Sequence, residues 1–157
     1  MSPPLRNEDD AKAIIEGLCD GTIDAVATDH APHSEEEKSL LFCQAPNGII
    51  GLETLLAVSL TYLYHTGEMH LNRVIELMSS KPAKILNLNA GKLETGGSAD
   101  IVIFDPDEEW TVDPSIFKSK ARNTPYGGMK LQGKVKYTIS KGKIVYYSDE
   151  LCSPEYK

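Results

Sequence analysis

The chain has 157 residues, a length typical of one domain; 41% are hydrophobic and 25% charged, as in ordinary globular proteins. Its formal charge of −7 argues against a nucleic-acid partner, because a polyanion is repelled by an acidic surface. The absence of any uninterrupted apolar run of about 18 residues excludes a membrane span, and the N-terminus lacks the apolar core of a secretory signal. The isolated cysteines Cys19, Cys43 and Cys152 indicate free thiols in a reducing cytoplasm, where we expect the protein to reside.

The first segments have the pattern of an α/β protein. A helix is predicted to begin after Asn7, an N-cap residue followed by acids, and to end at the D-G-T sequence of residues 20–22. The short apolar run Ile23–Thr28 predicts a buried strand. A helix and a strand joined by a short loop form half of a repeating α/β unit.

More helices are predicted after a polar loop and a segment whose Pro and Gly indicate irregular backbone. Apolar positions are nearly continuous from Leu52 to about Tyr64, which predicts a helix buried on most sides. Leu71 to Met78 predicts a second helix with one apolar face. Lys81–Pro82 favours a short third helix through Leu88, because proline is tolerated in a first turn.

The pattern changes to β structure beyond residue 89. Residues 99–105 predict a strand, and residues 133–147 predict a hairpin that turns at 140–142. The segment 106–128 is rich in turn residues and is predicted to be mostly loop. We therefore place a soft domain boundary near residue 89.

The first module, residues 1–88, is incomplete as an α/β unit. Its one convincing strand is apolar on both faces, as strands of parallel sheets are, and no parallel neighbour is encoded. We expect part of a larger barrel or sheet, stable only when paired with the rest of a barrel or with another copy of the chain. Residues 89–157 form a second, β-rich module.

Polar residues follow the predicted strand directly. Asp29 lies at its carboxyl end, where α/β folds gather their chemistry; a carboxylate there binds a metal, acts as a general base, or only caps the next turn. His33, beyond Pro32, is a candidate for holding an anionic substrate group. His30 is expected to point to the opposite face and to pack or hydrogen-bond locally. His65 and His70, at helix ends, are interpreted as structural.

The loop that contains Gly48 is a second candidate site. Glycine lets the backbone approach a ligand closely, and consecutive N–H groups can bind a carboxylate or a ring carbonyl. A simple turn before a helix explains the same residues, and spacing alone favours that turn.

Several motifs together resemble the C-terminal part of dihydroorotases, which belong to the amidohydrolase superfamily. The motifs that show this resemblance are D-G-T-I-D-A-V-A-T-D-H-A-P-H, E-E-K, A-P-N-G-I-I-G-L-E-T, P-P-L-R, K-P-A-K-I-L-N-L, G-S-A-D-I-V-I-F-D, S-K-A-R-N-T-P-Y and the closing hairpin. The resemblance implies an α/β fold: the C-terminal portion of a TIM-like (β/α)8 metal-dependent hydrolase barrel plus part of a small composite β-sandwich domain. T-D-H-A-P-H resembles the signature at the end of the eighth barrel strand.

The resemblance also implies roles for individual residues. Asp29 matches the aspartate that ligates one of two zinc ions and acts as catalytic acid/base, and His33 matches the histidine that binds the substrate carboxylate. Asn47 and Gly48 match positions whose backbone contacts substrate. Ser2 stands where the family usually has an asparagine, so one substrate contact is altered. Asn47 replaces a common phenylalanine, and P-N-G resembles the dihydropyrimidinases, an alternative that lacks the A-P-H ending.

The implied reaction is the reversible cyclisation of N-carbamoyl-L-aspartate to L-dihydroorotate in pyrimidine biosynthesis. In the hydrolytic direction, a zinc-bound hydroxide attacks the ring amide carbonyl. Asp29 takes its proton and passes it to the leaving nitrogen. His33 and the loop at 47–48 orient the ring through its carboxylate.

The family's remaining metal ligands, an H-x-H pair, a carbamylated lysine and two further histidines, come from strands that this chain does not encode. Catalytic sites use about three protein ligands per zinc, so we expect the chain alone neither to bind zinc tightly nor to catalyse. Three interpretations stay open: a fragment of a complete enzyme, one half of a split enzyme, and a non-catalytic scaffold subunit, for instance beside aspartate transcarbamoylase. The presence of Asp29 and His33 argues against a scaffold, which needs neither. The expected partners are a small-molecule substrate and the rest of the barrel, or a second copy of the chain in a homodimer.

Overall fold

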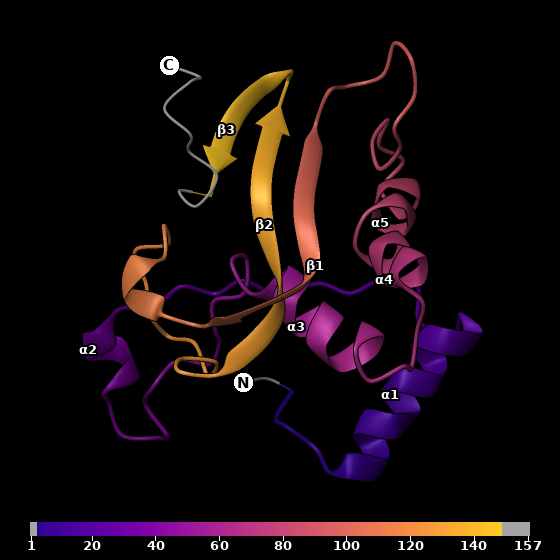
Figure 1. Cartoon of the computed structure of the whole chain (residues 1–157). Helices are drawn as coiled ribbons and strands as arrows, with labels where there is room; N and C mark the ends of the chain where they lie inside the picture. The colour runs from indigo at the N-terminus through magenta and orange to yellow at the C-terminus, as the bar shows by residue number, and fades with distance from the viewer. Residues whose placement is uncertain (1–2, 149–157) are drawn as a thin grey trace.

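The computed structural model describes residues 3–148, which form a group of helices beside a three-stranded sheet (Figure 1). The helical elements, in chain order, are α1 (Glu8–Asp20), α2 (Glu35–Lys38), α3 (Leu55–Ser59), the π-helical turn η1 (Leu60–Tyr64), α4 (Leu71–Met78) and α5 (Ser80–Ile85). None of the helices within residues 3–148 is long and apolar enough to cross a membrane.

Helix α1 begins and ends where its sequence signals predict. The side chain of Asn7 accepts a hydrogen bond from the Asp10 backbone N–H at 2.9 Å, which satisfies one of the unpaired donors of the first turn. Gly21 ends the helix in the left-handed conformation, with φ of 89°. Leu18 is buried near this end and contacts the core beneath α4.

The predicted strand Ile23–Thr28 is not a regular strand in the structure. A regular strand needs a neighbouring strand to pair with, and within the described residues the backbone of this segment makes only isolated hydrogen bonds. The Val26 N–H donates to the Leu77 carbonyl at 3.0 Å, at the end of α4, and a single parallel bridge joins His30 to Ile49. The apolar side chains of Ile23 and Val26 still pack on the helical core.

Two predicted helices need corrected boundaries, and one predicted loop contains a helical turn. The helix predicted from Leu52 begins as α3 at Leu55 and continues as η1, whose i→i−5 hydrogen bond joins the His65 N–H to the Leu60 carbonyl at 2.9 Å. The third predicted helix, α5, ends at Ile85, before Leu88. The S-E-E-E-K loop contains a single helical turn, α2, held by a capping box between Ser34 and Glu37.

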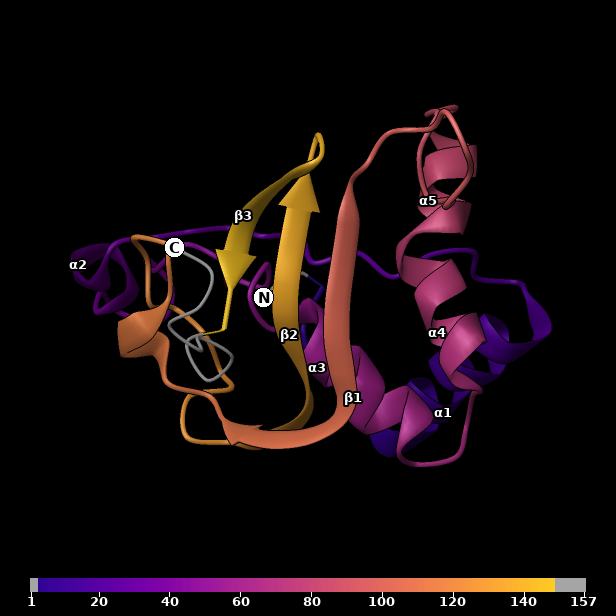
Figure 2. The ribbon, with the colours of Figure 1, turned by 45° about the horizontal axis from the view of Figure 1, so that its top comes forward.

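The sheet is antiparallel in the order β1-β2-β3, formed by β1 (Ile101–Thr111), β2 (Lys130–Ser140) and β3 (Lys143–Tyr147) (Figure 2). The predicted hairpin is confirmed, since Lys141 and Gly142 both take the positive φ of a tight two-residue turn. β1 is longer than predicted, because its irregularity after Asp105 accommodates Pro106 without breaking the pairing. The predicted loop 106–128 therefore contains the end of β1, and also a short 3-10 turn at Pro114–Ile116.

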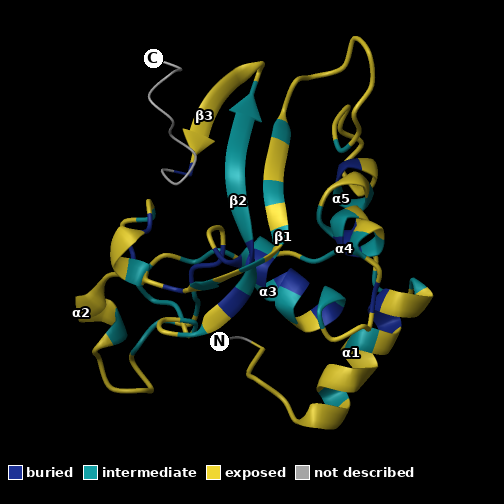
Figure 3. Ribbon diagram, in the orientation of Figure 1, coloured by how far each residue is buried: buried dark blue, intermediate teal, exposed yellow. Residues whose placement is uncertain are grey.

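The core consists of two clusters of buried apolar side chains. Figure 3 colours the buried residues dark blue, for example along α3 and at the start of β2. The first lies among the helices: Leu18, Leu60, Leu63, Met69, Val74 and Leu77. The second lies where α3 and the residues before it meet β2 and the loop between β1 and β2: Ile50, Ala57, Val112, Phe117, Ala121 and Leu131. Because the second cluster combines side chains from before and after residue 89, the two modules share a core. The division at residue 89 stays a proposal about sequence organisation.

Candidate functional site

Asp29 is exposed at the beginning of the segment 29–33. Its φ of 43° lies in the left-handed region, which costs a residue with a Cβ about 1–2 kcal/mol and is tolerated best by Asp and Asn. No group within residues 3–148 hydrogen-bonds to its carboxylate. The structure thus leaves this carboxylate open to solvent and available to a ligand, whereas a turn-capping aspartate would bind the backbone.

His30 is held by the backbone at the start of the helical segment that follows. Its Nδ1 accepts hydrogen bonds from the N–H groups of Gly51 at 3.1 Å and Leu52 at 3.4 Å. Because Nδ1 accepts, the proton of the neutral ring is assigned to Nε2. The prediction that His30 hydrogen-bonds locally is confirmed. Its own N–H donates to the Thr28 hydroxyl at 3.1 Å, which closes a small turn around Asp29.

The two candidate segments, 29–33 and 46–50, lie side by side. The Ala31 N–H donates to the Ile49 carbonyl at 2.9 Å. Gly48 has a φ of 121°, and a Cβ placed on it would lie 2.6 Å from the Ala31 Cβ and 3.3 Å from Nε2 of His33. Only glycine permits this approach, so the His33 ring lies directly against the backbone at Gly48.

Asn123 connects both segments to the C-terminal half of the chain. Its Nδ2 donates to the carbonyls of Ala31 at 2.9 Å and Gly48 at 3.2 Å, and its Oδ1 accepts from the His33 N–H at 3.3 Å. Its backbone carbonyl accepts from the Ile50 N–H at 3.1 Å. Sequence reasoning assigned no role to this residue, although it stands in the S-K-A-R-N-T-P-Y motif. An asparagine among turn residues carries no local sign of contacts made 92 residues away.

A lysine supports the same loop from the other side. Lys38, half-buried at the end of α2, donates through Nζ to the carbonyls of Pro46 at 2.9 Å and Gly48 at 3.2 Å. The Gly48 carbonyl therefore accepts two hydrogen bonds, one from Lys38 and one from Asn123. Both lone pairs of that oxygen are engaged, which fixes the loop.

Glu37 faces the other nitrogen of His33. The Nδ1 of His33 lies 3.5 Å from Oε2 of Glu37, and the imidazole is mostly buried, with 24% of the side chain exposed. The Ser34 N–H donates to the Glu37 carboxylate and, with a smaller contribution from His33, lowers the pKa of that carboxyl below its ordinary value. His33 is thus held between a carboxylate and the backbone of the 46–50 loop.

The remaining predicted site residues have different surroundings. Asn47 is exposed beside Gly48, as a backbone contact to substrate requires, and Ser2 and Cys152 lie outside the described residues. Within residues 3–148 no three His, Cys, Asp or Glu side chains lie close enough to hold a metal ion. Asp29 alone could supply one oxygen ligand, so the described residues do not build a metal centre by themselves. Weak zinc binding by the isolated chain stays a prediction.

The two outlying histidines differ from each other. His65 ends η1, and its Nε2 donates to the Pro106 carbonyl in β1 at 2.8 Å, so its structural role is confirmed. His70 is the N-cap of α4. An imidazole gains nothing from the helix dipole at this end, because the dipole of an N-terminus favours negative charge.

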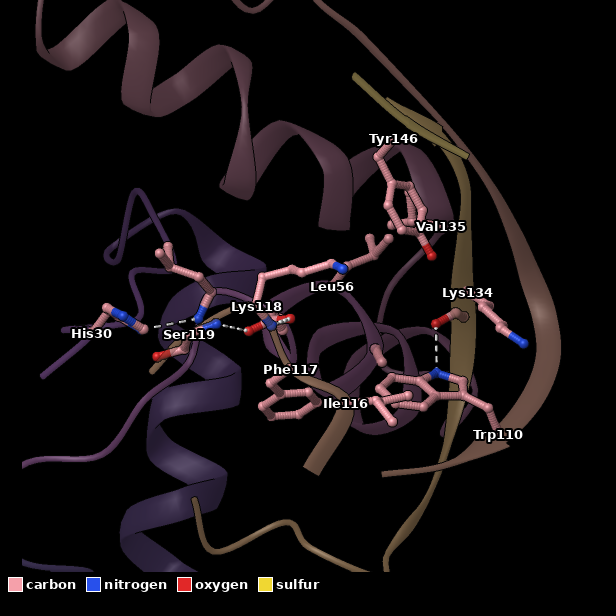
Figure 4. A pocket seen from close by; sticks show the side chains of 14 residues that line it. His30, Leu56, Trp110, Ile116, Phe117, Lys118, Ser119, Lys134, Val135 and Tyr146 are labelled. Atoms are coloured by element: carbon pink, nitrogen blue, oxygen red, sulfur yellow. Dashed lines mark hydrogen bonds between the residues drawn. The ribbon is translucent and has the colours of Figure 1, made fainter. Parts of the chain in front are cut away.

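A mainly apolar cavity of about 620 Å³ lies beside this site (Figure 4). Among its lining residues are His30, Leu56, Trp110, Phe117 and Val135, and the lining includes neither Asp29 nor His33. The Glu53 carboxylate, on the wall, accepts the N–H groups of Lys118 and Ser119, and the Trp110 indole donates to the Gly133 carbonyl. The cavity is therefore a gap between α3 and the sheet that reaches the polar segment 29–33 only at His30.

The chain belongs to the amidohydrolase family, whose model matches residues 2–145. Its similar relatives include the dihydroorotase of Clostridioides difficile, 58% identical over 93% of this chain and 34% of the relative, and that of Caldanaerobacter subterraneus, 51% identical over 94% and 34%. Similar solved structures include the L-hydantoinase (dihydropyrimidinase) of Arthrobacter aurescens, with 34% identity over 94% of this chain and 34% of that protein and a TM-score of 0.85. The dihydropyrimidinase of Brevibacillus agri gives 28% identity, 93% and 33% coverage and a TM-score of 0.87. The chain thus spans about a third of the length of these relatives.

Proposed function

We propose that this chain is the part of a dihydroorotase that carries the catalytic acid/base and the substrate-carboxylate site. The observation that supports this most is the 58% identity to a dihydroorotase across 93% of the chain, including both paired segments. We also propose that residues 1–88 complete a TIM-like barrel, that residues 89–157 belong to a composite β-sandwich, and that the protein is cytoplasmic.

Asp29 suits the role of proton carrier. An exposed carboxylate with no hydrogen-bond partner within residues 3–148 is free to accept a proton from the attacking water. In the hydrolytic direction, a bond forms between the water oxygen and the ring amide carbon, and the carbon–nitrogen bond breaks. Asp29 accepts the proton of the water and delivers it to the departing nitrogen, so the carboxylate is regenerated.

His33 and the loop at 47–48 suit recognition of the substrate carboxylate. An imidazole that lies against the backbone at a glycine can bind an anion, and a carboxylate so held fixes the orientation of the ring. Ser2 would contribute a hydroxyl contact to the same substrate. Zinc would belong to the assembled barrel, with Asp29 as one of its oxygen ligands and the others supplied from outside residues 3–148.

A dihydropyrimidinase- or hydantoinase-like activity is the second candidate. The similar solved structures named above are hydantoinases, and the P-N-G sequence resembles dihydropyrimidinases. Their identity of 28–34% is well below that of the dihydroorotases, so we favour dihydroorotate as the substrate. A non-catalytic scaffold subunit would have no need of the open Asp29 carboxylate.

Complementation tests the function. The chain is assayed for dihydroorotate hydrolysis and zinc content alone, and again after co-expression with the part of the Clostridioides difficile dihydroorotase that it does not match. We expect turnover only from the combined protein. In that protein Asp29→Asn should lower kcat about 10²- to 10⁴-fold, the usual contribution of a general acid/base.

Asp24→Asn is the matched control, because Asp24 is an exposed acid five residues earlier that pairs with Lys81 at 3.1 Å. It should leave kcat within about twofold, since an exposed ion pair contributes little. Turnover by the isolated chain would contradict the need for the rest of the barrel. A combined protein that hydrolyses hydantoin and ignores dihydroorotate would establish the second candidate instead.

A further inference from the structure

We propose that Asn123 is a positioning residue that sets the distance between His33 and the loop at Gly48, and thereby the affinity for the substrate carboxylate. The proposal rests on the proposed function, because it assigns these two elements to the substrate. Asn123 is half-buried and makes four hydrogen bonds to the two segments, three through its side chain.

The chemistry of these partners determines the orientation of the amide. Two of its partners are the carbonyl oxygens of Ala31 and Gly48, which only accept hydrogen bonds, so both must face Nδ2. The His33 N–H only donates, so it must face Oδ1. A flipped amide would put like against like at all three contacts. No other side chain of this size offers two donors and an acceptor in one plane.

The hydrogen bonds of Asn123 fix the two segments of the candidate site relative to each other, although Asn123 belongs to neither segment. Ala31 and His33 are alternate residues of one segment, and Gly48 belongs to the other, so a single planar group holds both backbones at once. Lys38 binds the Gly48 carbonyl from the opposite side, but it contacts neither Ala31 nor His33. Asn123 is therefore the side chain that binds Gly48 and His33 together, in addition to the direct Ala31–Ile49 hydrogen bond between the segments.

Aspartate at position 123 has nearly the same shape and removes both donors. A carboxylate would then face two carbonyl oxygens, and the two segments would separate. Asn123 has no hydrogen bond to Asp29, so proton transfer by Asp29 should be less affected than substrate binding. An interaction made equally in ground state and transition state changes KM and leaves kcat, which is the expected signature.

The first measurement uses the chain itself and needs no activity. Amide hydrogen exchange is compared between the parent chain and three variants: Asn123→Asp, the milder Asn123→Ser, and Asn89→Asp. Asn89 is exposed in a loop, so its variant is the control. We expect the His33 and Ile50 amides to exchange at least about tenfold faster in both position-123 variants and unchanged in the control. In the parent chain, the two side-chain amide protons of Asn123 should exchange slowly, because both are hydrogen-bonded.

The second measurement uses the combined protein described above, with L-dihydroorotate as substrate. Asn123→Asp should raise KM about tenfold or more and change kcat less than about threefold, with a smaller rise in KM for Asn123→Ser. Equal losses in kcat and KM, wild-type KM, or failure of both variants to fold would overturn the positioning role. If the parent protein does not hydrolyse dihydroorotate, the proposed function fails, whereas the exchange result still decides whether Asn123 couples the two segments.

Discussion

At the residue scale, the candidate site depends on two backbone positions that most residues avoid. Asp29 and Gly48 both have positive φ, and they lie on the two segments that meet at the Ala31–Ile49 hydrogen bond. Asp29 combines its strained backbone with an exposed side chain, and the glycine admits the His33 ring. Local strain of this kind persists where surrounding contacts over-determine the backbone, as those of His30, Lys38 and Asn123 do here.

Glu37 makes the wall beside His33 sensitive to acid. The pKa of Glu37 is lowered chiefly by the Ser34 N–H, so its contribution to the stability of α2 is present above the ordinary glutamate pKa of about 4.3. It is lost as the pH falls through the lower pKa of the folded state. Glu37→Gln, which keeps an acceptor but does not titrate, should abolish this transition.

Carboxyl-carbon NMR measures the titration of Glu37, and backbone shifts of residues 35–38 report melting of α2. Glu35→Gln, on the same helical turn, should leave the transition in place. A transition that survives Glu37→Gln would mean that another group controls α2.

At the element scale, the approach of β2 to η1 depends on Gly133. Its φ is 99°, and a Cβ there would overlap Cδ1 of Leu60 and lie 3.4 Å from its Cβ; Leu60 is fully buried. The strand can therefore lie on η1 only where it lacks a side chain. The Gly133 carbonyl also accepts a hydrogen bond from the indole N–H of Trp110, which connects β1 to β2 at this glycine.

Gly133→Ala should destabilise the chain by about 2–4 kcal/mol, combining an overpacked core with left-handed strain. Gly128→Ala is the matched control, because its φ of 77° is also positive and its Cβ would meet open space. It should cost only the strain, about 1–2 kcal/mol. Urea unfolding measures both, and equal losses would show that contact with Leu60 is unimportant.

At the scale of the whole molecule, apolar surface remains uncovered. Phe42 is fully exposed, and large hydrophobic side chains are also exposed on α1, α5, β1 and β3, among them Ile14, Ile85, Val102 and Val145. Exposed apolar patches of this kind are interaction sites or aggregation hazards. The chain spans about a third of its relatives' length. A segment equivalent to the remaining two thirds of such a relative would be able to cover these exposed apolar side chains.

We expect the isolated chain to self-associate with increasing concentration, and co-expression with the complementary part of a relative to abolish this and raise Tm. Sedimentation velocity and thermal denaturation measure the two effects. A chain that stays monomeric at all concentrations and melts sharply would contradict the expectation that residues 1–88 need the rest of a barrel or a second copy.

Local signals predicted many elements correctly, for identifiable reasons. The Asn7 cap, the Gly21 stop and the hairpin turn at 141–142 depend on contacts within a few residues, which the sequence displays. The predicted strand Ile23–Thr28 failed because a strand is defined by its neighbours and not by its own apolar residues. The end of β1 was missed because proline at an irregularity looks, in sequence, like a loop.

The sequence by itself determined the resemblance to the family, Asp29 as a candidate carboxylate, and the glycine at 48. Only the tertiary structure decided that His33 and Gly48 adjoin and that Asn123 holds them, through hydrogen bonds spanning 75 to 92 residues of chain. The reason is physical: the orientation of an amide is set by the donors and acceptors around it, and these come together only when distant backbone segments pack against each other.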